Sequence, residues 1–164
     1  MQHNQSSPIT NLLFLGLLVT GFAHGQPIGI PVPPLGAGPW TFDTAEQHKI
    51  QVSVVASGLS HPWAIAFMPD GDLLVTERPG RLRVIRDGVL DPQAISGVPE
   101  VRSEGNGGLQ DVALHPDFAE NRLVYLTYTK PMENGWGAPA LAMGRLEAGA
   151  LIDVRDLIVT EAYE

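Results

Sequence analysis

The sequence predicts an all-β fold built from short strands and tight turns, and three observations support this prediction. After residue 49, short runs of β-branched and apolar residues alternate with Pro-Asp, Pro-Gly and Asp-Gly pairs, which are typical of turns between strands. No stretch after residue 25 shows a sustained helical period. Two segments of the chain also resemble each other, which indicates an internal repeat of a β-sheet unit.

The composition of the 164-residue chain limits its function. Apolar residues make up 44% of the chain, which is enough for a packed core. The formal net charge of −8, without a basic cluster, argues against nucleic acids and anionic membranes as partners. The chain has no cysteine, which excludes disulfides, thiolate metal sites and cysteine nucleophiles.

Residues 1–25 are predicted to be a signal peptide. Residues 12–23 (LLFLGLLVTGFA) form an apolar run that is too short to span a bilayer and matches the core of such a peptide. Ala23 and Gly25 provide small residues for cleavage after Gly25, although the leader contains no Lys or Arg. A buried N-terminal helix is the alternative. We therefore expect a periplasmic or secreted protein without membrane contact after leader cleavage.

Residues 26–48 are predicted to be a linker. Residues 26–40 (QPIGIPVPPLGAGPW) are dense in proline, which cannot donate to a strand ladder, and in glycine, which is costly to order. We expect folded structure to begin near Lys49, so that residues 49–164 form the folded part.

The folded part is expected to contain a regular series of strands separated by Pro-Asp, Pro-Gly and Asp-Gly turns. Residues 81–85, the last of these strands, alternate charged and apolar side chains, as expected for a strand with one solvated face. The predicted strands are residues 50–56, 63–68, 73–76 and 81–85. The large side chains expected in the core are Trp63, Phe67, Leu74, Tyr125 and Tyr128.

The internal repeat indicates a particular architecture. Residues 64–77 (AIAFMPDGDLLVTE) resemble residues 111–128 (DVALHPDFAENRLVYLTY), and Pro69 and Pro116 are 47 residues apart. A repeat of about 40–50 residues is typical of the four-stranded blades of a β-propeller, although two unrelated β-hairpins would give the same pattern. Residues 49–164 provide about two to two and a half blades, whereas closure needs about four to eight. The sequence therefore predicts an incomplete propeller, the N-terminal part of a larger one.

Two long motifs resemble a known family. Residues 58–85 (GLSHPWAIAFMPDGDLLVTERPGRLRVI) and residues 105–129 (GNGGLQDVALHPDFAENRLVYLTYT) are similar to the start of the soluble glucose/sorbosone dehydrogenases, which are exported, pyrroloquinoline-quinone (PQQ)-dependent aldose sugar dehydrogenases. The resemblance implies a six-bladed β-propeller that holds PQQ and Ca²⁺. It also implies oxidation of an aldose at its anomeric carbon to a lactone, with transfer of electrons to an acceptor.

The resemblance places little of that catalytic machinery in this chain. The family's general-base histidine lies in a His-x-Gly-Gly motif, and this sequence ends at Glu164 before such a motif. The family's calcium ligands and cationic cofactor contacts belong to later blades. We therefore expect no catalytic or metal-binding residue here, and a fragment that is inactive alone.

Asn106 and Gly107 are the candidate cofactor-binding residues. Asn106 takes the position of a family glutamine that lines the pocket for substrate and cofactor, and it keeps the amide donor and acceptor on a shorter side chain. The glycines around it permit positive φ angles and close approach of a ligand. A plain turn residue is the alternative role for Asn106.

Other polar residues are expected to be structural. His115 lies in a Pro-Asp corner whose repeat equivalent is Met68, and His61 has no partner at metal-ligand spacing. Asp70 and Asp72 suit a turn better than a calcium loop, because the remaining ligands are missing. Glu77 and Arg78 are adjacent on a predicted strand, so they should face opposite sides and not pair with each other. One of them is expected to face the channel and the other to lie in a contact between blades, and a structural role is expected for both.

Two further functions stay open. The scaffold also suits a non-catalytic exported propeller that binds a carbohydrate or a protein, since a fold does not dictate a function. A calcium-dependent propeller lactonase would need acidic ligands around the channel, and the sequence contains no such set.

Overall fold

The computed structural model describes Gly36, residues 38–133 and residues 135–161. The chain divides into two units, Met1–Gly36 and Ala37–Glu164, and the account below concerns the second. The expected signal peptide and residues 26–35 of the expected linker lie outside the described residues. No helix in the described part of the chain is long and apolar enough to cross a membrane.

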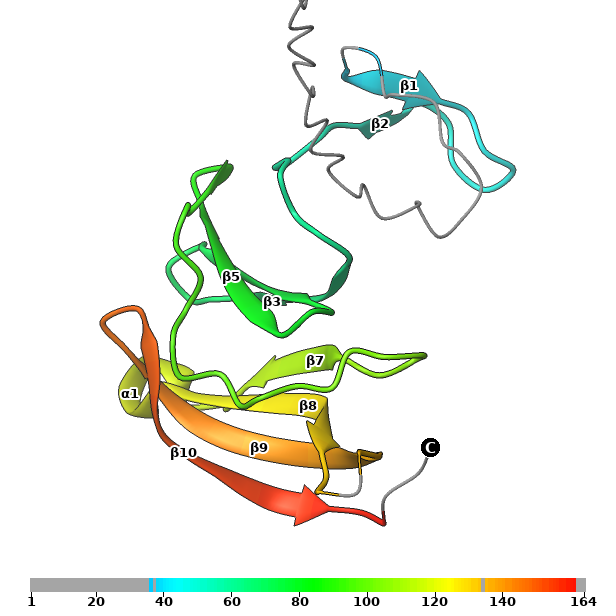
Figure 1. The fold of residues 1–164 in the computed structure, drawn as a ribbon. Coiled ribbons are helices and arrows are strands. Elements are labelled where there is room, and N and C mark those ends of the chain that lie inside the picture. Colours follow the sequence, from blue (N-terminus) through cyan, green and yellow to red (C-terminus); the bar gives the residue numbers. More distant parts are fainter. Residues whose placement is uncertain (1–35, 37, 134, 162–164) are drawn as a thin grey trace, which may run out of the picture. The chain divides into compact units, whose positions relative to one another are not determined.

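The described residues form antiparallel β-sheets with one short helix, which confirms the all-β prediction (Figure 1). A hairpin of β1 (Trp40–Phe42) and β2 (Ile50–Val52) comes first. The first four-stranded sheet contains β3 (Pro62–Phe67), β4 (Leu73–Glu77), β5 (Arg81–Arg86) and β6 (Val89–Leu90). The second contains β7 (Leu109–Leu114), β8 (Leu123–Pro131), β9 (Gly137–Glu147) and β10 (Ala150–Val159). In both sheets consecutive strands are neighbours.

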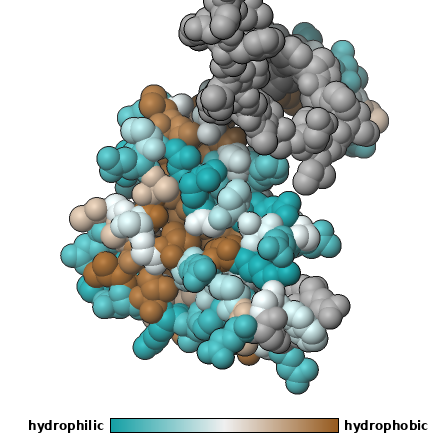
Figure 2. Space-filling view, in the orientation of Figure 1, coloured by the Kyte–Doolittle hydropathy of each residue, from teal (hydrophilic) through white to brown (hydrophobic). Residues whose placement is uncertain are grey.

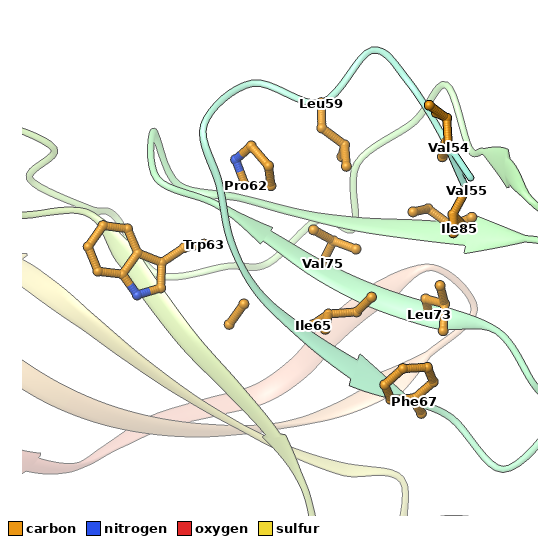
Figure 3. Close-up of a pocket in the computed structure, with 12 residues that line it drawn as sticks. Val54, Val55, Leu59, Pro62, Trp63, Ile65, Phe67, Leu73, Val75 and Ile85 are labelled. Atoms are coloured by element: carbon orange, nitrogen blue, oxygen red, sulfur yellow. The ribbon is translucent and has the colours of Figure 1, made fainter. Parts of the chain in front are cut away.

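The strand boundaries near residue 50 differ from those expected. β1 lies inside the range expected as a linker, and its Trp-Thr-Phe sequence has the aromatic and β-branched residues that suit a strand. β2 ends at Val52, because its partner β1 is only three residues long. Val54 and Val55, expected in the same strand, instead line a groove on the first sheet (Figure 3).

A one-turn helix, α1 (Phe118–Asn121), lies in the connection between β7 and β8. Phe118 anchors it with 2% exposure, and the Arg122 guanidinium lies 4.6 Å from the centre of the Phe118 ring. Arg122 adopts a left-handed conformation and donates its N–H to Phe118 O, which ends the helix. A four-residue helix has no measurable period, which explains why the sequence did not reveal it.

The two sheets repeat the same backbone arrangement. The pairing register shifts near the start of β3 and again near the start of β7. At the first shift Ala64 N–H donates to Thr76 Oγ1, and at the second Asp111 N–H donates to Thr127 Oγ1, both at 3.0 Å. Ala64 and Asp111 are 47 residues apart, so the repeat seen in the sequence is a repeat in the structure.

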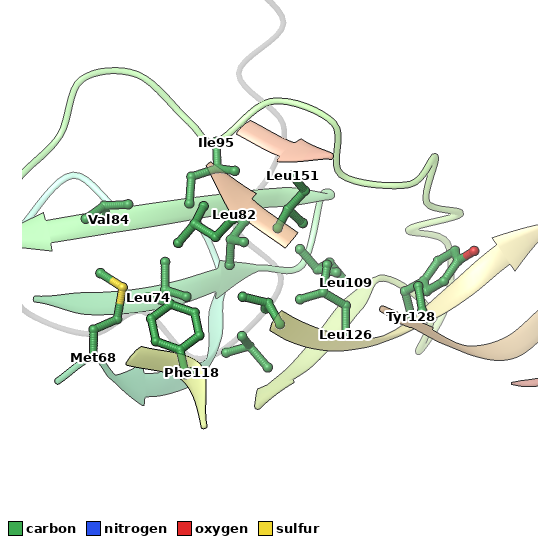
Figure 4. Close-up of a cluster of buried hydrophobic side chains, with 14 of the residues drawn as sticks. Met68, Leu74, Leu82, Val84, Ile95, Leu109, Phe118, Leu126, Tyr128 and Leu151 are labelled. Carbon is green, nitrogen blue, oxygen red and sulfur yellow. The ribbon is translucent and has the colours of Figure 1, made fainter. Parts of the chain in front are cut away.

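The core lies between the two sheets. β7 contacts both β3 and β4, so the sheets pack face to face. Leu74 and Leu82 of the first sheet are fully buried, as are Leu109 and Val124 of the second (Figure 4). The connection between β6 and β7 forms backbone hydrogen bonds with both sheets. Ile95 N–H donates to Leu82 O of the first sheet at 2.8 Å, and Ser96 O accepts from Leu151 N–H of the second at 2.8 Å.

The predicted core was right in part. Leu74 and Tyr128 are buried, with 0% and 2% exposure, and Tyr125 is half-buried. The prediction was wrong for Trp63 and Phe67, which are exposed to 57% and 73%. Alternate residues of β3 face opposite sides of the sheet. Trp63 and Phe67 lie on the side that the second sheet does not cover, and apolar side chains are visible at the surface (Figure 2).

Candidate functional site

The glycine-rich loop of residues 103–108 connects the first sheet to β7. Residues 103–106 are exposed, whereas Gly107 and Gly108 are buried. Gly105 and Gly108 have positive φ angles of 54° and 149°. The sequence suggested such angles, and glycine adopts them without a Cβ clash.

Arg78, directly after β4, holds this loop against the first sheet. Its Nε donates to Gly107 O at 3.0 Å, and its second terminal nitrogen donates to Ser103 O at 2.9 Å and to Gly105 O at 2.6 Å. Its backbone carbonyl accepts the Leu109 N–H at 2.9 Å. One guanidinium therefore fixes three carbonyl groups of the neighbouring sheet's entry loop, as its rigid fork of donors permits.

The contacts explain two of the glycines. A Cβ on Gly108 would lie 2.5 Å from Arg78 Cγ and 2.6 Å from Arg78 O. A Cβ on Gly107 would lie 2.7 Å from Arg102 O and 3.1 Å from Thr129 Oγ1. These positions need glycine because the protein itself approaches closely there.

Thr129 of β8 and Arg102, which directly precedes the loop, hold the loop against the second sheet. Arg102 Nε donates to Gly135 O at 3.1 Å, and Arg102 forms a 2.9 Å ion pair with Glu104. The Gly108 N–H donates to Thr129 Oγ1 at 3.3 Å, and Thr129 is buried. The loop is thus fixed on both sides.

Asn106 lies at the exposed part of this fixed loop, and its side chain forms no hydrogen bond to a described residue. Gly107 is different, because its N–H donates to Glu104 O at 2.8 Å and its carbonyl accepts from Arg78. The side chain of Asn106 is therefore available to a ligand, while both backbone groups of Gly107 already have partners in the protein. The cofactor-binding role of both residues stays a prediction.

Glu77 is a buried carboxylate at the centre of an ion-pair cluster. Its carboxylate accepts the backbone N–H of Ser60 and pairs with Arg81 Nε at 2.5 Å and Arg83 at 3.3 Å. Burial alone would raise the pKa of Glu77. The hydrogen bonds from Arg81, Ser60 and Arg83 and the positive charge of Arg81 lower this pKa, and together they outweigh burial. The pKa of Glu77 therefore lies below its usual value, and the side chain is ionised at neutral pH.

Two of the expectations for Glu77 and Arg78 are confirmed. They form no ion pair with each other within the described part of the chain, and Arg78 makes the contact between the sheets. Both roles are structural.

A second polar cluster was not found from the sequence. The Tyr128 hydroxyl donates to Asp156 Oδ1 at 2.7 Å, and Lys130 Nζ lies 2.5 Å from Asp156 Oδ2. They line a cavity of about 320 Å³ together with Glu100 and Arg155. Burial and then the Asp156 carboxylate raise the pKa of Tyr128. Residues 128 and 156 meet only through strand pairing, so no local motif marks them.

The histidines and turn aspartates have structural contacts. His115 Nδ1 accepts the Asp117 N–H at 3.0 Å, and its ring stacks on Tyr125 with 6.2 Å between centroids. Asp70 Oδ1 accepts the Asp72 N–H at 3.2 Å, which is the turn contact expected. Among the described residues no three His, Asp or Glu side chains are placed to hold a metal ion.

Comparison with known proteins places this fold. Residues 59–163 match the family described as Glucose / Sorbosone dehydrogenase. The chain is 39% identical over 118 residues to the aldose sugar dehydrogenase YliI of Escherichia coli, which covers 71% of this chain and 31% of that protein.

Solved structures of aldose sugar dehydrogenases are also similar to this chain. The soluble aldose sugar dehydrogenase of E. coli in its apo-form has a TM-score of 0.62 and 40% identity, covering 65% of this chain and 32% of the other. The PQQ-bound aldose sugar dehydrogenase of Streptomyces coelicolor has a TM-score of 0.58 and 26% identity, covering 66% and 33%. The chain thus spans about a third of the length of these relatives.

Proposed function

The chain belongs to the glucose / sorbosone dehydrogenase family, and we propose from this that it is part of a PQQ-dependent dehydrogenase that oxidises aldose sugars. Its two four-stranded sheets are then two blades of a six-bladed β-propeller. Relatives named as aldose sugar dehydrogenases, one of them in a PQQ-bound form, support this proposal.

The observation that carries the proposal is the loop that presents Asn106. Three hydrogen bonds from Arg78 fix the loop at the place where the chain enters the second sheet, and Asn106 is exposed there without a partner in the described part. A polar side chain on a rigid, exposed loop suits ligand binding better than packing.

The described residues fit one edge of a quinone site. The Asn106 amide offers two donors and one acceptor, which suit the oxygens of a quinone or a sugar. Arg78 is committed to three carbonyl groups, and the described residues contain no metal-binding group. Calcium would therefore be held by residues outside the described part.

In this reaction PQQ, when bound, supplies the acceptor for the two electrons and the hydrogen removed from the anomeric carbon. The contribution of this chain is positioning. Asn106 donates a hydrogen bond to an oxygen of the bound ligand, and Arg78 prevents the loop from moving when it does so. The product would be the lactone, and an external acceptor would take the electrons.

The remaining expectations are part of the same proposal. The protein would be exported to the periplasm or secreted. The 164 residues alone would be inactive, because the described residues contain no cluster of His, Asp and Glu side chains that could hold the metal ion.

The test is PQQ-dependent reduction of a dye by aldoses, measured on the protein encoded by the complete gene and loaded with PQQ and Ca²⁺. Asn106→Ala should lower kcat/KM about tenfold, equal to one lost hydrogen bond. Asn106→Gln, which restores the amide, should retain most activity. No PQQ-dependent reduction together with retained carbohydrate binding would overturn the proposal and favour a non-catalytic binding propeller.

A further inference from the structure

Asn106 and Gly107 form an Asn-Gly pair at the centre of the fixed loop. In such a pair the backbone nitrogen of the glycine can attack the side-chain amide carbon of the asparagine. Glycine permits this attack best, because it has no Cβ to shield its nitrogen. The loop of the candidate site therefore contains two residues that can react with each other.

The reaction consumes one water molecule and releases one ammonia molecule. The Gly107 nitrogen loses its proton and bonds to Asn106 Cγ, and the side-chain nitrogen leaves with that proton as ammonia. The product is a five-membered succinimide ring. Water then opens the ring at one of its two carbonyl carbons, which gives aspartate or, where the backbone carbonyl is attacked, isoaspartate. Either product has a carboxylate in place of the amide.

The turn that contains Asn106 opposes closure of this ring. The Gly107 N–H donates to Glu104 O at 2.8 Å, which closes a four-residue turn with Asn106 as its third residue. In turns of this kind the third residue has a ψ of about 0°, which places the next nitrogen about a third of a turn away from Cβ. The ring needs this nitrogen eclipsed with Cβ. The hydrogen bond to Glu104 O must therefore break before the ring can close.

Arg78 fixes the backbone on both sides of the reactive peptide unit. Its guanidinium binds Gly105 O, in the peptide unit before Asn106, at 2.6 Å. It also binds Gly107 O, in the peptide unit after Gly107, at 3.0 Å. The reactive unit lies between these two and is itself held by Glu104 O. Three consecutive peptide units are thus fixed, so Asn106 cannot rotate about ψ unless the loop leaves Arg78.

We propose that Asn106 is a deamidation site that Arg78 holds in an unreactive conformation. The reaction takes place in the molecules whose loop has opened, so its rate follows the free energy of local opening. An ionised aspartate or isoaspartate donates no hydrogen bond, whereas the amide offers two donors. Deamidation would therefore remove the contact proposed for Asn106. The reaction itself does not depend on the proposed function.

The test follows deamidation by mass spectrometry of the tryptic peptide Ser103–Arg122, from the protein encoded by the complete gene and kept without sugar or PQQ. We expect Asn106 to react at least about tenfold more slowly in the folded wild type than in urea. Arg78→Ala should raise the rate in the folded protein at least about tenfold, because the hydrogen bonds that hold the loop are lost. Arg78→Lys should give an intermediate rate, because one ammonium cannot reproduce the fork of donors.

Two controls show that the effect is local. Arg155→Ala, at an exposed arginine, should deamidate at the wild-type rate. Hydrogen exchange of β5 and β8 should be the same in Arg78→Ala as in the wild type, whereas residues 103–108 should exchange faster. If Arg78→Ala is not folded, Arg78→Lys takes its place in the comparison.

Three results would overturn this proposal. The first is an equal rate of deamidation at Asn106 in the folded wild type and in urea. The second is an equal rate in the wild type and the folded Arg78 variants, and the third is the same acceleration in Arg155→Ala. Because the peptide mass is measured without sugar or PQQ, these outcomes are separate from the outcome of the activity test.

Discussion

Glu77 and Arg78 are adjacent in the chain and stabilise different parts of the protein. Glu77 is fully buried and binds Arg81 and Arg83 within the first sheet. Arg78 extends to the loop of residues 103–108 and binds three of its carbonyl groups. The first residue holds a sheet together, and the second joins it to the next sheet at the candidate site.

Replacement of Arg78 should release the loop. Arg78→Ala removes three charge-assisted hydrogen bonds, and we expect a loss of about 2–4 kcal/mol in the free energy of unfolding. Arg78→Lys should recover only part, because one ammonium cannot reproduce the fork. Denaturant unfolding measures the loss. Arg155→Ala, at an exposed arginine, is the control and should change little. Equal losses in the two alanine variants would contradict the role of Arg78.

The close approach of Arg78 to Gly108 predicts a steric effect. Gly108→Ala places a Cβ 2.5 Å from Arg78 Cγ and 2.6 Å from Arg78 O, so the two sheets must separate locally. We expect a loss of more than about 2 kcal/mol. Gly105→Ala is the matched control: its φ is also positive, but a Cβ there meets nothing within 4 Å. It should cost about 1–2 kcal/mol from backbone strain alone. Thermal and denaturant unfolding compare the two variants.

The lowered pKa of Glu77 predicts a pH-dependent stability. A carboxylate with a folded pKa below its unfolded value stabilises the protein above the unfolded pKa, about 4.3, and this contribution is lost as pH falls through the folded pKa. Glu77→Gln should therefore cost about 3 kcal/mol at pH 7, because Arg81 and Arg83 lose their partner. The difference from the wild type should shrink in acid.

The control for Glu77 is Glu104→Gln, which removes an exposed ion pair with Arg102. It should change the free energy of unfolding by less than about 1 kcal/mol at any pH. Unfolding by urea between pH 3 and pH 8 measures both variants. A Glu77→Gln deficit that is independent of pH would contradict the assignment of an ionised Glu77.

The two threonines of the repeat should differ in their effects. Thr76 is fully buried and its hydroxyl joins the sheets through Gln110 O, whereas Thr127 only accepts the Asp111 N–H within the described part of the chain. Thr76→Val should therefore cost about 1–3 kcal/mol, and Thr127→Val about 0.5–1.5 kcal/mol. Chemical denaturation distinguishes them, and a larger loss for Thr127→Val would be inconsistent with the hydrogen bonds described.

The local features of the fold could be predicted from the sequence. The Pro-Asp corners and the 47-residue spacing depend on turn chemistry and strand patterning, which are encoded in neighbouring residues. The separate roles of Glu77 and Arg78 followed from the two-residue period of a strand. Asp70 was correctly interpreted as a turn residue from turn chemistry, and His115 as a structural residue because its repeat equivalent is Met68.

Features that depend on which surface is covered could not be predicted. Trp63 and Phe67 have large apolar side chains of the kind found in cores. They are exposed because they lie on the side of β3 that the second sheet does not cover, and the sequence does not show which side that is. Tyr128 and Asp156 meet through the pairing of three strands, which no local pattern records. The sequence also did not show why position 107 needs glycine, because the atoms that approach it closely belong to Arg102 and Thr129 of the protein and not to a ligand.

The most direct test of the account is a crystal structure of the protein with PQQ and Ca²⁺ bound. We predict that the Asn106 amide lies within about 2.7–3.2 Å of an oxygen of the cofactor or a bound sugar, and that Arg78 retains its hydrogen bonds to Ser103, Gly105 and Gly107. A cofactor bound elsewhere, with Asn106 facing only solvent, would contradict the assignment of this loop as the functional site.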